Sequence, residues 1–452
     1  MKNKHFDLTQ GGIVQKLVTV AVPIIGTQLM QMAYNLTDMF WLGRVGDGQG
    51  AVAASGTVGM FMWLMMAPMM LARMGAEIGA GQAFGSKDEE KAKGYIQNSI
   101  LIAFLLSIVF LVPSLLFYKE LISIFNLVGK EVIRDAESYL QIVTLALPFF
   151  FMTGSVNAAF NASGNSRTPF FCNSLGLMVN MVLDPVLIFS CNMGVIGAAW
   201  ATITAQTIVF FASLIALYCS KNRPFPSFSL RFKVDWFVWR RIFNWGLPIA
   251  LESGLFTVLT TFTTQMQNLY GTSATAVSRV GSQIESLSWL LAGGFGAALT
   301  TFIAQNYGAK KPERVQKGLR ISVGLMGGWE IVVTLIMIFV GKDLVLIFLP
   351  NLKELDIARG YMLILSMCQV TMGLESVYAA YFKGTGKTVP PAIVSIASNA
   401  FRVLLAFILE KTPLGLYGVF LGVSIGAVIR GIWITLWYYS VTRKQAKMMP
   451  TM

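Results

Sequence analysis

The sequence predicts an all-α polytopic membrane protein with twelve transmembrane helices in two parallel six-helix repeats around a central cleft. Of its 452 residues, 55% are hydrophobic and 13% are charged, with a mean hydropathy of +0.63. A soluble domain carries about 25% charged residues. Apolar runs of about 20 residues recur along the chain, long enough to cross a hydrocarbon core about 30 Å thick. The third observation is a set of short motifs that recur in the second half.

The apolar runs give six spans in each half. The first six are predicted over residues 15–42, 51–72, 95–117, 136–160, 168–190 and 194–218. The second six are predicted over residues 242–268, 275–302, 320–340, 357–382, 389–410 and 414–440. The predicted organisation is an amino-terminal lobe (1–218), a cytoplasmic linker (219–241), a carboxy-terminal lobe (242–440) and a cytoplasmic tail (441–452).

The two halves share sequence landmarks. Pro23 corresponds to Pro248, and the Gly-Gln-x-x-Gly stretch at 81–85 corresponds to Ala-Gln-Asn-Tyr-Gly at 304–308. Because six spans return the chain to the side where it began, the repeats are parallel and related by an axis along the membrane normal. This symmetry predicts a substrate site in the cleft between the halves, and transport by rocking of the two lobes.

The net charge of +13 is explained by the membrane topology and does not indicate nucleic-acid binding. Lys and Arg gather around 87–93, 221–241 and 310–320, which alternate with less basic loops. This positive-inside bias predicts a multi-pass protein of the cytoplasmic membrane with both termini in the cytoplasm. The amino terminus lacks the small-residue cleavage site of a signal peptide, and the four scattered cysteines predict no disulfide framework.

The main functional signal is a set of polar residues inside predicted spans of the first half. The first span carries one polar stripe, formed by Gln28, Gln31, Asn35 and Asp38, with Tyr34 beside it. On the fifth span Asn180 and Asp184 share a face, and Pro185 removes a backbone hydrogen bond next to the carboxylate. The sixth span contributes Thr202.

These groups are expected at one depth, about 8–12 Å from the outer ends of their helices. Two carboxylates that meet in a low dielectric do not both ionise readily, so the pair would take up a proton or bind a cation. Intramembrane acids are functional by default. The plainer alternative is that Asp38 and Asp184 are interhelical hydrogen-bond partners, or that Asp38 reaches the outer interface.

The second half has acids at other positions. Asn180 corresponds to a position near Arg402, and Asp184 to one near Ala406. Glu252 and Glu375 are candidates to line the cleft and attract cationic substrates, whereas the other two acids in these spans, at positions 285 and 330, are equally consistent with structural roles.

Neither a nucleotide-binding site nor a catalytic histidine is indicated by the remaining motifs. The stretch Gly384–Thr388 ends like a phosphate-binding loop, but Tyr381 replaces the required glycine and no strand precedes it. A single histidine, His5, lies near the chain end. The sequence therefore predicts neither ATP-driven transport nor an enzyme.

The two six-span halves, the two Gln-containing loops and the Asn180-x-x-x-Asp184-Pro185 motif resemble the multidrug and toxic compound extrusion (MATE) family over nearly the whole chain. Asp38 with this motif is similar to the DNA-damage-inducible-type prokaryotic branch. There the resemblance implies a cation site in the amino-terminal lobe, with Thr202 as a further ligand. It also implies that Gln31, Tyr34 and Asn157 line that lobe's cavity. The norfloxacin-type branch has a key Glu where this chain has Phe256, which argues against a second cation site.

The combined expectation is a cation-coupled antiporter that exports organic cations and other amphipathic drugs by alternating access. It would use protons or Na⁺ as the coupling ion and no cofactor, and would act as a monomer in the lipid bilayer. For Na⁺, the expected ligands are Asp38, Asn180, Asp184 and Thr202. The alternative is a flippase for lipid-linked precursors, which predicts a strongly cationic cavity.

Overall fold

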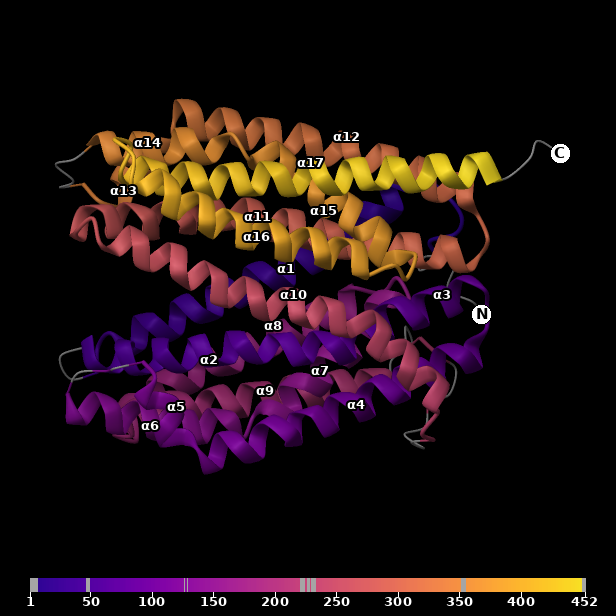
Figure 1. Ribbon diagram of the computed structural model, residues 1–452. Coiled ribbons are helices and arrows are strands. Elements are labelled where there is room, and N and C mark those ends of the chain that lie inside the picture. The colour runs from indigo at the N-terminus through magenta and orange to yellow at the C-terminus, as the bar shows by residue number, and fades with distance from the viewer. Residues whose placement is uncertain are drawn as a thin grey trace. The chain divides into compact units, whose positions relative to one another are not determined.

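The computed structural model describes residues 7–45, 49–125, 127, 129–219, 224–225, 228, 233–350 and 355–448, and this part of the chain is helical without strands (Figure 1). Within the described residues, eleven helices are long and apolar enough to cross a membrane. The pair α6 (Lys130–Thr144) and α7 (Leu147–Ala162), bent by 48°, makes a twelfth if it is one span. The predicted all-α membrane architecture is confirmed.

The helices follow the predicted runs in order. The first half contains α1 (Ile13–Leu42), α2 (Gln49–Met74), η1 (Gly75–Ala80), α3 (Gly81–Gly85), α4 (Glu89–Leu116), α5 (Tyr118–Ser123), α6, α7, α8 (Arg167–Pro185), η2 (Val186–Ser190) and α9 (Gly194–Cys219). The second half contains α10 (Trp236–Asn268), α11 (Thr272–Gly308), α12 (Pro312–Phe339), α13 (Gly341–Phe348), α14 (Leu355–Ser366), α15 (Gln369–Gly384), α16 (Val389–Glu410) and α17 (Leu416–Met448).

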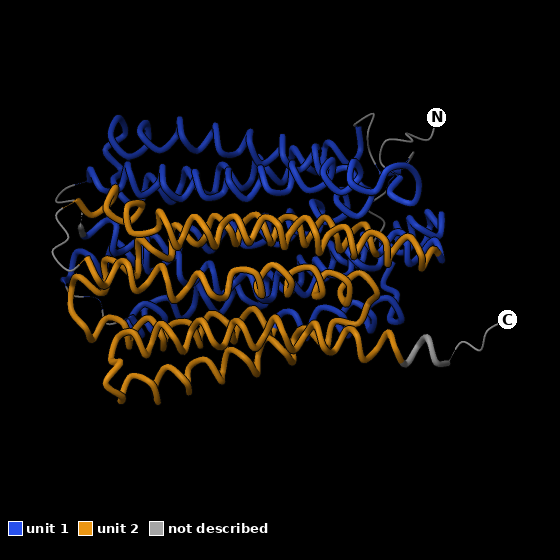
Figure 2. The backbone as a smooth tube through the Cα atoms, turned by 90° about the horizontal axis from the view of Figure 1, so that it is seen from above, with its two compact units in different colours: residues 1–250, 304–310 blue, residues 251–303, 311–452 orange. Residues whose placement is uncertain are grey.

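The chain forms two compact units, coloured separately in Figure 2. Unit 1 comprises residues 1–250 and 304–310, and unit 2 comprises residues 251–303 and 311–452. The predicted lobe boundaries stay predictions, and part of the predicted linker and the last four residues of the predicted tail lie outside the described residues.

The end of α11 belongs to unit 1 and is held there by side-chain hydrogen bonds. The Gln305 amide donates to the backbone oxygen of Ala162 at 2.7 Å, and its oxygen accepts from the backbone N–H of Leu8 at 3.0 Å. Gly85 lies directly against the backbone of Gln305, and Gly308 against that of Gln82. The two stretches that the sequence pairs by similarity are both helical, as α3 and the last turn of α11, and they pack against each other.

Within unit 1, α8 lies between α1 and α9. Gly176 permits close contact between α8 and the side chain of Val209 on α9. At Pro185 the α-helical pattern gives way to the π-helical turn η2, since proline cannot donate the next backbone hydrogen bond. The irregular segment directly follows Asp184.

Within unit 2, α16 and α17 form a tight pair. Gly418, Gly422 and Gly426 recur every fourth residue of α17, and their backbones meet α16 at Leu409, Ala406 and Arg402 respectively. Small residues at this spacing let membrane helices approach closely.

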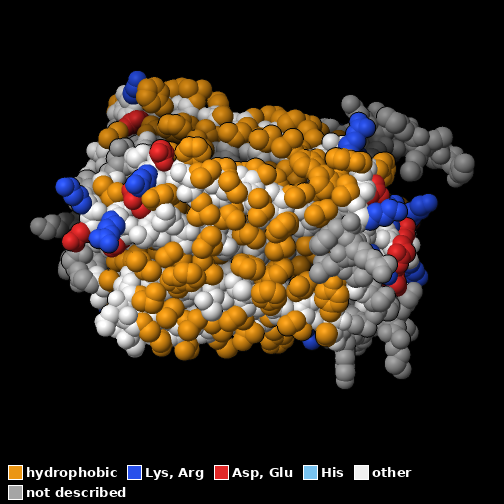
Figure 3. Space-filling model, turned by 90° about the horizontal axis from the view of Figure 1, so that it is seen from below, with side chains coloured by type: hydrophobic (Ala, Val, Ile, Leu, Met, Phe, Trp, Pro, Cys, Tyr) orange, Lys and Arg blue, Asp and Glu red, His pale blue; other side chains and the backbone are white. Residues whose placement is uncertain are grey.

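The surface has the pattern expected of a lipid-facing protein. Large apolar side chains are exposed along most spans, among them Val109, Phe171 and Ile215. In Figure 3, hydrophobic side chains cover the middle of the visible face, whereas Lys, Arg, Asp and Glu gather toward its two ends. An apolar band between charged ends matches a bilayer between two aqueous phases.

Candidate cation-coupling site

Three helices of unit 1 bring the predicted polar residues together. Tyr34 packs with Leu177 of α8 and Ala205 of α9 in one small apolar cluster. Asp38 follows Tyr34 by one helical turn, so its side chain faces the same two helices. Asn180 and Asp184 are both 0% exposed, and Asp38 is half-buried.

The two carboxylates are neighbours. Asp38 lies in hydrogen-bonding range of both Asp184 and Asn180. The Asn180 amide donates to Asp184 Oδ1 at 3.1 Å. Because the pair combines two acids in an apolar environment, holding both in the ionised form is unfavourable.

Three buried oxygens of this group have no protein hydrogen-bond partner among the described residues. They are Asp38 Oδ1, Asn180 Oδ1 and Asp184 Oδ2. A buried oxygen without a partner costs free energy unless a proton, a water or an ion satisfies it. Carboxylate and amide oxygens are the ligands that hard cations prefer, so the donor set suits Na⁺ as well as a proton. The described residues contain no group of three His, Cys, Asp or Glu side chains that suits a metal ion.

Thr202 joins the site through two tyrosines. The Tyr34 hydroxyl donates to Thr202 Oγ1 at 3.0 Å. Tyr139 of α6 also lies in hydrogen-bonding range of Thr202 and in electrostatic range of Asp38 and Asp184. The sequence prediction missed Tyr139, since it stands in no polar stripe. The available signal was a tyrosine in an amphipathic helix of the predicted fourth span, directly before the span that carries Asn180 and Asp184.

Replacing Tyr34 with Phe should lower the free energy of unfolding by about 1 kcal/mol, the net value of one hydrogen bond. Thr202→Val removes the same bond from the other side. The double variant should then be less destabilised than the sum of the two single variants, by about 0.5–1.5 kcal/mol. Thermal unfolding of the detergent-purified proteins measures this. Strict additivity would show that the hydrogen bond contributes nothing.

The other two predicted residues of this lobe, Gln31 and Asn157, differ in their exposure. Gln31 is exposed on α1, and Asn157 of α7 is half-buried with an unpartnered Oδ1. Neither forms a hydrogen bond to the acids among the described residues. Their predicted role in lining the cavity stays a prediction.

In unit 2, the predicted substrate-binding acids differ in their surroundings. Glu375 of α15 forms an ion pair with Arg430 of α17 at 2.9 Å, which neutralises much of its charge. Glu252 of α10 is half-buried in electrostatic range of Glu375, and its Oε2 has no partner in the described part of the chain. Glu252 is thus the better placed of the two to attract a cationic group.

The remaining intramembrane acids of unit 2 have hydrogen-bond donors. Ser288 donates to Glu330 at 2.8 Å, and the Gln369 amide donates to Glu285 at 3.2 Å. These bonds favour the structural reading of both acids, which the sequence left open.

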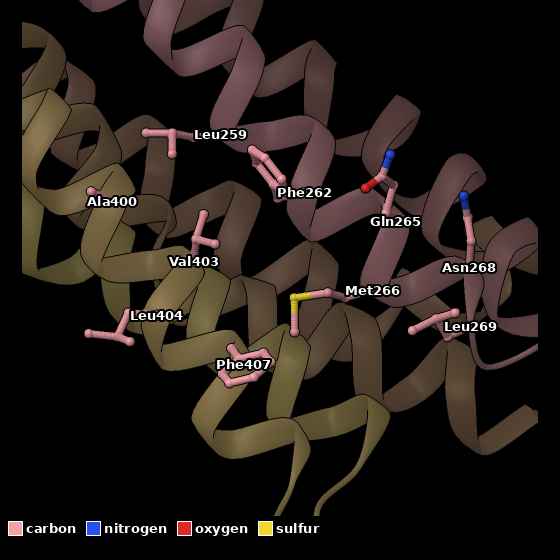
Figure 4. A pocket seen from close by; sticks show the side chains of 10 residues that line it. All are labelled: Leu259, Phe262, Gln265, Met266, Asn268, Leu269, Ala400, Val403, Leu404 and Phe407. Carbon is pink, nitrogen blue, oxygen red and sulfur yellow. The ribbon is translucent and has the colours of Figure 1, made fainter. Parts of the chain in front are cut away.

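A pocket of about 810 Å³ lies between α10 and α16 in unit 2. Figure 4 shows apolar side chains of the two helices, including Leu259, Phe262 and Val403, around this space. None of the predicted site residues lines it. The pocket can hold an apolar group but offers no ionisable partner.

Comparisons with known proteins identify relatives of this chain along most of its length. The MatE family profile matches residues 23–186 and 248–408, so both halves match the same profile. The chain is 25% identical to "Probable multidrug resistance protein NorM" of Thermotoga maritima, with 95% of this chain and 92% of that protein covered. It is 27% identical to "Probable multidrug resistance protein YoeA" of Bacillus subtilis, with 94% and 93% covered.

The fold has matches among solved structures. A structure described as "Crystal structure of MATE in the bent conformation" superposes with a TM-score of 0.92 at 21% identity, with 99% of each chain covered. The family is one of transporters and not of enzymes, as the sequence predicted. From the profile match to both halves, we conclude that this chain belongs to the MatE (MATE) family of membrane transporters.

Proposed function

We propose that this protein exports amphipathic and cationic compounds by alternating access, in exchange for the inward flow of protons or Na⁺. The main support for this proposal is the group formed by Asp38, Asn180 and Asp184. Its two acids are adjacent, and each of the three side chains has a buried oxygen without a hydrogen-bond partner among the described residues. The names of the relatives support small-molecule drugs as the substrates.

The acid pair provides a means of coupling. A proton or Na⁺ at the pair removes one net negative charge and satisfies oxygens that lack protein partners. Asp38 is on α1, whereas Asn180 and Asp184 are on α8, so the change alters the force between the two helices. Pro23 interrupts the backbone hydrogen bonds of α1 and gives that helix a place to bend. Bending of α1 would reshape the cavity of this lobe and displace the substrate.

The coupling ion is the first quantity to measure. Liposomes that contain the purified protein should accumulate a cationic dye when a proton or a Na⁺ gradient drives the coupling ion outward. If protons are used, a pH gradient without Na⁺ suffices. If Na⁺ is used, dye movement requires a Na⁺ gradient at equal pH. Dye exchange that responds to neither gradient would contradict coupled antiport.

We also propose the setting of this activity. The protein would act as a monomer in the cytoplasmic membrane with both termini in the cytoplasm, since the basic loops lie on that side under the positive-inside rule. Single cysteines introduced at the start of α4 and at the carboxy terminus of the protein, and labelled in sealed cells, would test this orientation. Labelling of either site from outside would contradict it.

A further inference from the structure

Arg402 in unit 2 is a buried cation without an ion pair among the described residues. It lies on α16 and is 8% exposed. One guanidinium nitrogen donates to Thr260 Oγ1 of α10 at 3.0 Å, and the guanidinium carbon is 5.8 Å from the ring centre of Phe256. Its Nε has no hydrogen-bond partner in the described part of the chain. Buried arginines are normally paired with a carboxylate or phosphate.

The charged neighbours of Arg402 do not provide that partner. Glu285 of α11 lies in electrostatic range, but its described hydrogen bond comes from Gln369. Arg430 of α17 also lies in range and adds positive charge, although Glu375 pairs with it at 2.9 Å. Arg402 thus faces one acid beyond ion-pair distance and one paired arginine.

The stem of Arg402 is held in place by helix packing. The backbone of α17 at Gly426 lies against the Cβ and Cγ atoms of Arg402, so little room remains for the stem to move. Phe256 and Thr260 are four residues apart on α10 and present one apolar and one polar surface to the guanidinium. A guanidinium whose stem is fixed by packing and which lies beside an aromatic ring matches the needs of an aromatic carboxylate.

The apolar pocket between α10 and α16 is a separate feature. Its lining residues Val403 and Leu404 follow Arg402 on α16, and on a helical wheel their mean direction points away from Arg402. The polar face with Arg402 and Thr260 is therefore distinct from the pocket of Figure 4.

We propose that Arg402 is a recognition site for the carboxylate group of transported amphipathic compounds. The protein would then accept carboxylate-bearing molecules, with Arg402 donating to the carboxylate through Nε and a second nitrogen. This inference deepens the proposed export function and rests on it for the transport step, whereas the binding step can be measured alone.

A matched pair of dyes tests this assignment. Rhodamine 110 carries a free carboxylate, and rhodamine 123 is its methyl ester. Binding of each dye to protein in lipid nanodiscs is measured by fluorescence polarisation. Arg402→Gln should weaken rhodamine 110 binding by about 10-fold or more, the value of a charge-assisted hydrogen bond. The same variant should change rhodamine 123 binding by less than about twofold, because an ester has no charge to pair.

Two further variants separate recognition from structure. Arg402→Lys keeps the charge and loses the planar fork, so it should retain part of the preference for the carboxylate dye. Thr260→Val removes the bridge between α10 and α16 and leaves the guanidinium in place, so rhodamine 110 binding should persist. Equal losses for both dyes in Arg402→Gln, or a Thr260→Val variant that matches Arg402→Gln, would overturn the proposal.

The outcome is distinguishable from failure of the proposed function. Binding in nanodiscs involves no ion gradient, so an error about coupling leaves this test unaffected. Conversely, a protein that couples dye export to an ion gradient but binds rhodamine 110 equally well in the wild type and in Arg402→Gln would refute the carboxylate site alone.

Discussion

Replacing Asp38 with Asn should abolish coupled efflux while the protein remains folded in the membrane. Asn has nearly the shape of Asp but neither ionises nor takes up a proton, so the pair with Asp184 loses one of its two carboxyl groups, the one on α1. The folded protein should be as stable as the wild type or more stable, since the substitution removes an acid next to another buried acid. Dye efflux from cells and thermal unfolding of purified protein measure the two effects.

Thr37→Val is the matched control. Thr37 precedes Asp38 on α1, and its hydroxyl donates to the backbone oxygen of Ala33 at 2.9 Å within the same helix. Its removal should leave efflux unchanged, which shows that the region tolerates loss of a polar group. Normal drug resistance in Asp38→Asn cells would eliminate Asp38 as the coupling acid.

Gly85→Ala should be strongly destabilising for a different reason. A Cβ atom at position 85 would overlap the backbone oxygen of Gln305, and one at position 308 would overlap that of Gln82. Neither backbone can shift without disturbing the hydrogen bonds that Gln305 makes to Leu8 and Ala162. We expect a loss of at least about 1–3 kcal/mol, the usual cost of overpacking, and the same from Gly308→Ala.

Gly94→Ala controls for the general effect of replacing a helical glycine. Nothing lies within 4 Å of a Cβ at position 94, which is inside α4. Alanine there should be neutral or stabilising by up to about 1 kcal/mol because it favours the helix. Comparing melting temperatures in one detergent tests the contrast. Equal stability of the Gly85→Ala and Gly94→Ala variants would contradict the close packing of α3 against the end of α11.

The architecture was predictable because long apolar runs have few alternatives in a membrane. Backbone groups in hydrocarbon must be satisfied within the helix, so each run of sufficient length becomes a helix. The fourth span was harder to predict, because its two parts, α6 and α7, meet at a 48° bend that composition alone does not locate. Composition also does not show that the end of α11 packs in unit 1, since this depends on which helix ends meet.

The polar residues of the candidate site were recognisable for a similar reason. Acids are rare in apolar spans, so Asp38 and Asp184 were conspicuous, and their positions predicted a similar depth. Tyr139 was not conspicuous, because tyrosine is common in membrane helices. Its proximity to Thr202 follows from the packing of α6 against α9.

The sequence by itself determined the membrane helices, their order, the repeat and the buried acids, because each of these follows from local composition and from the cost of polar groups in hydrocarbon. Only the tertiary structure decided which side chains meet. It placed Thr202 against Tyr34, paired Glu375 with Arg430, and left Arg402 beside Thr260 without an ion pair. These contacts depend on helix rotation and close approach at small residues, which are set by packing between distant parts of the chain.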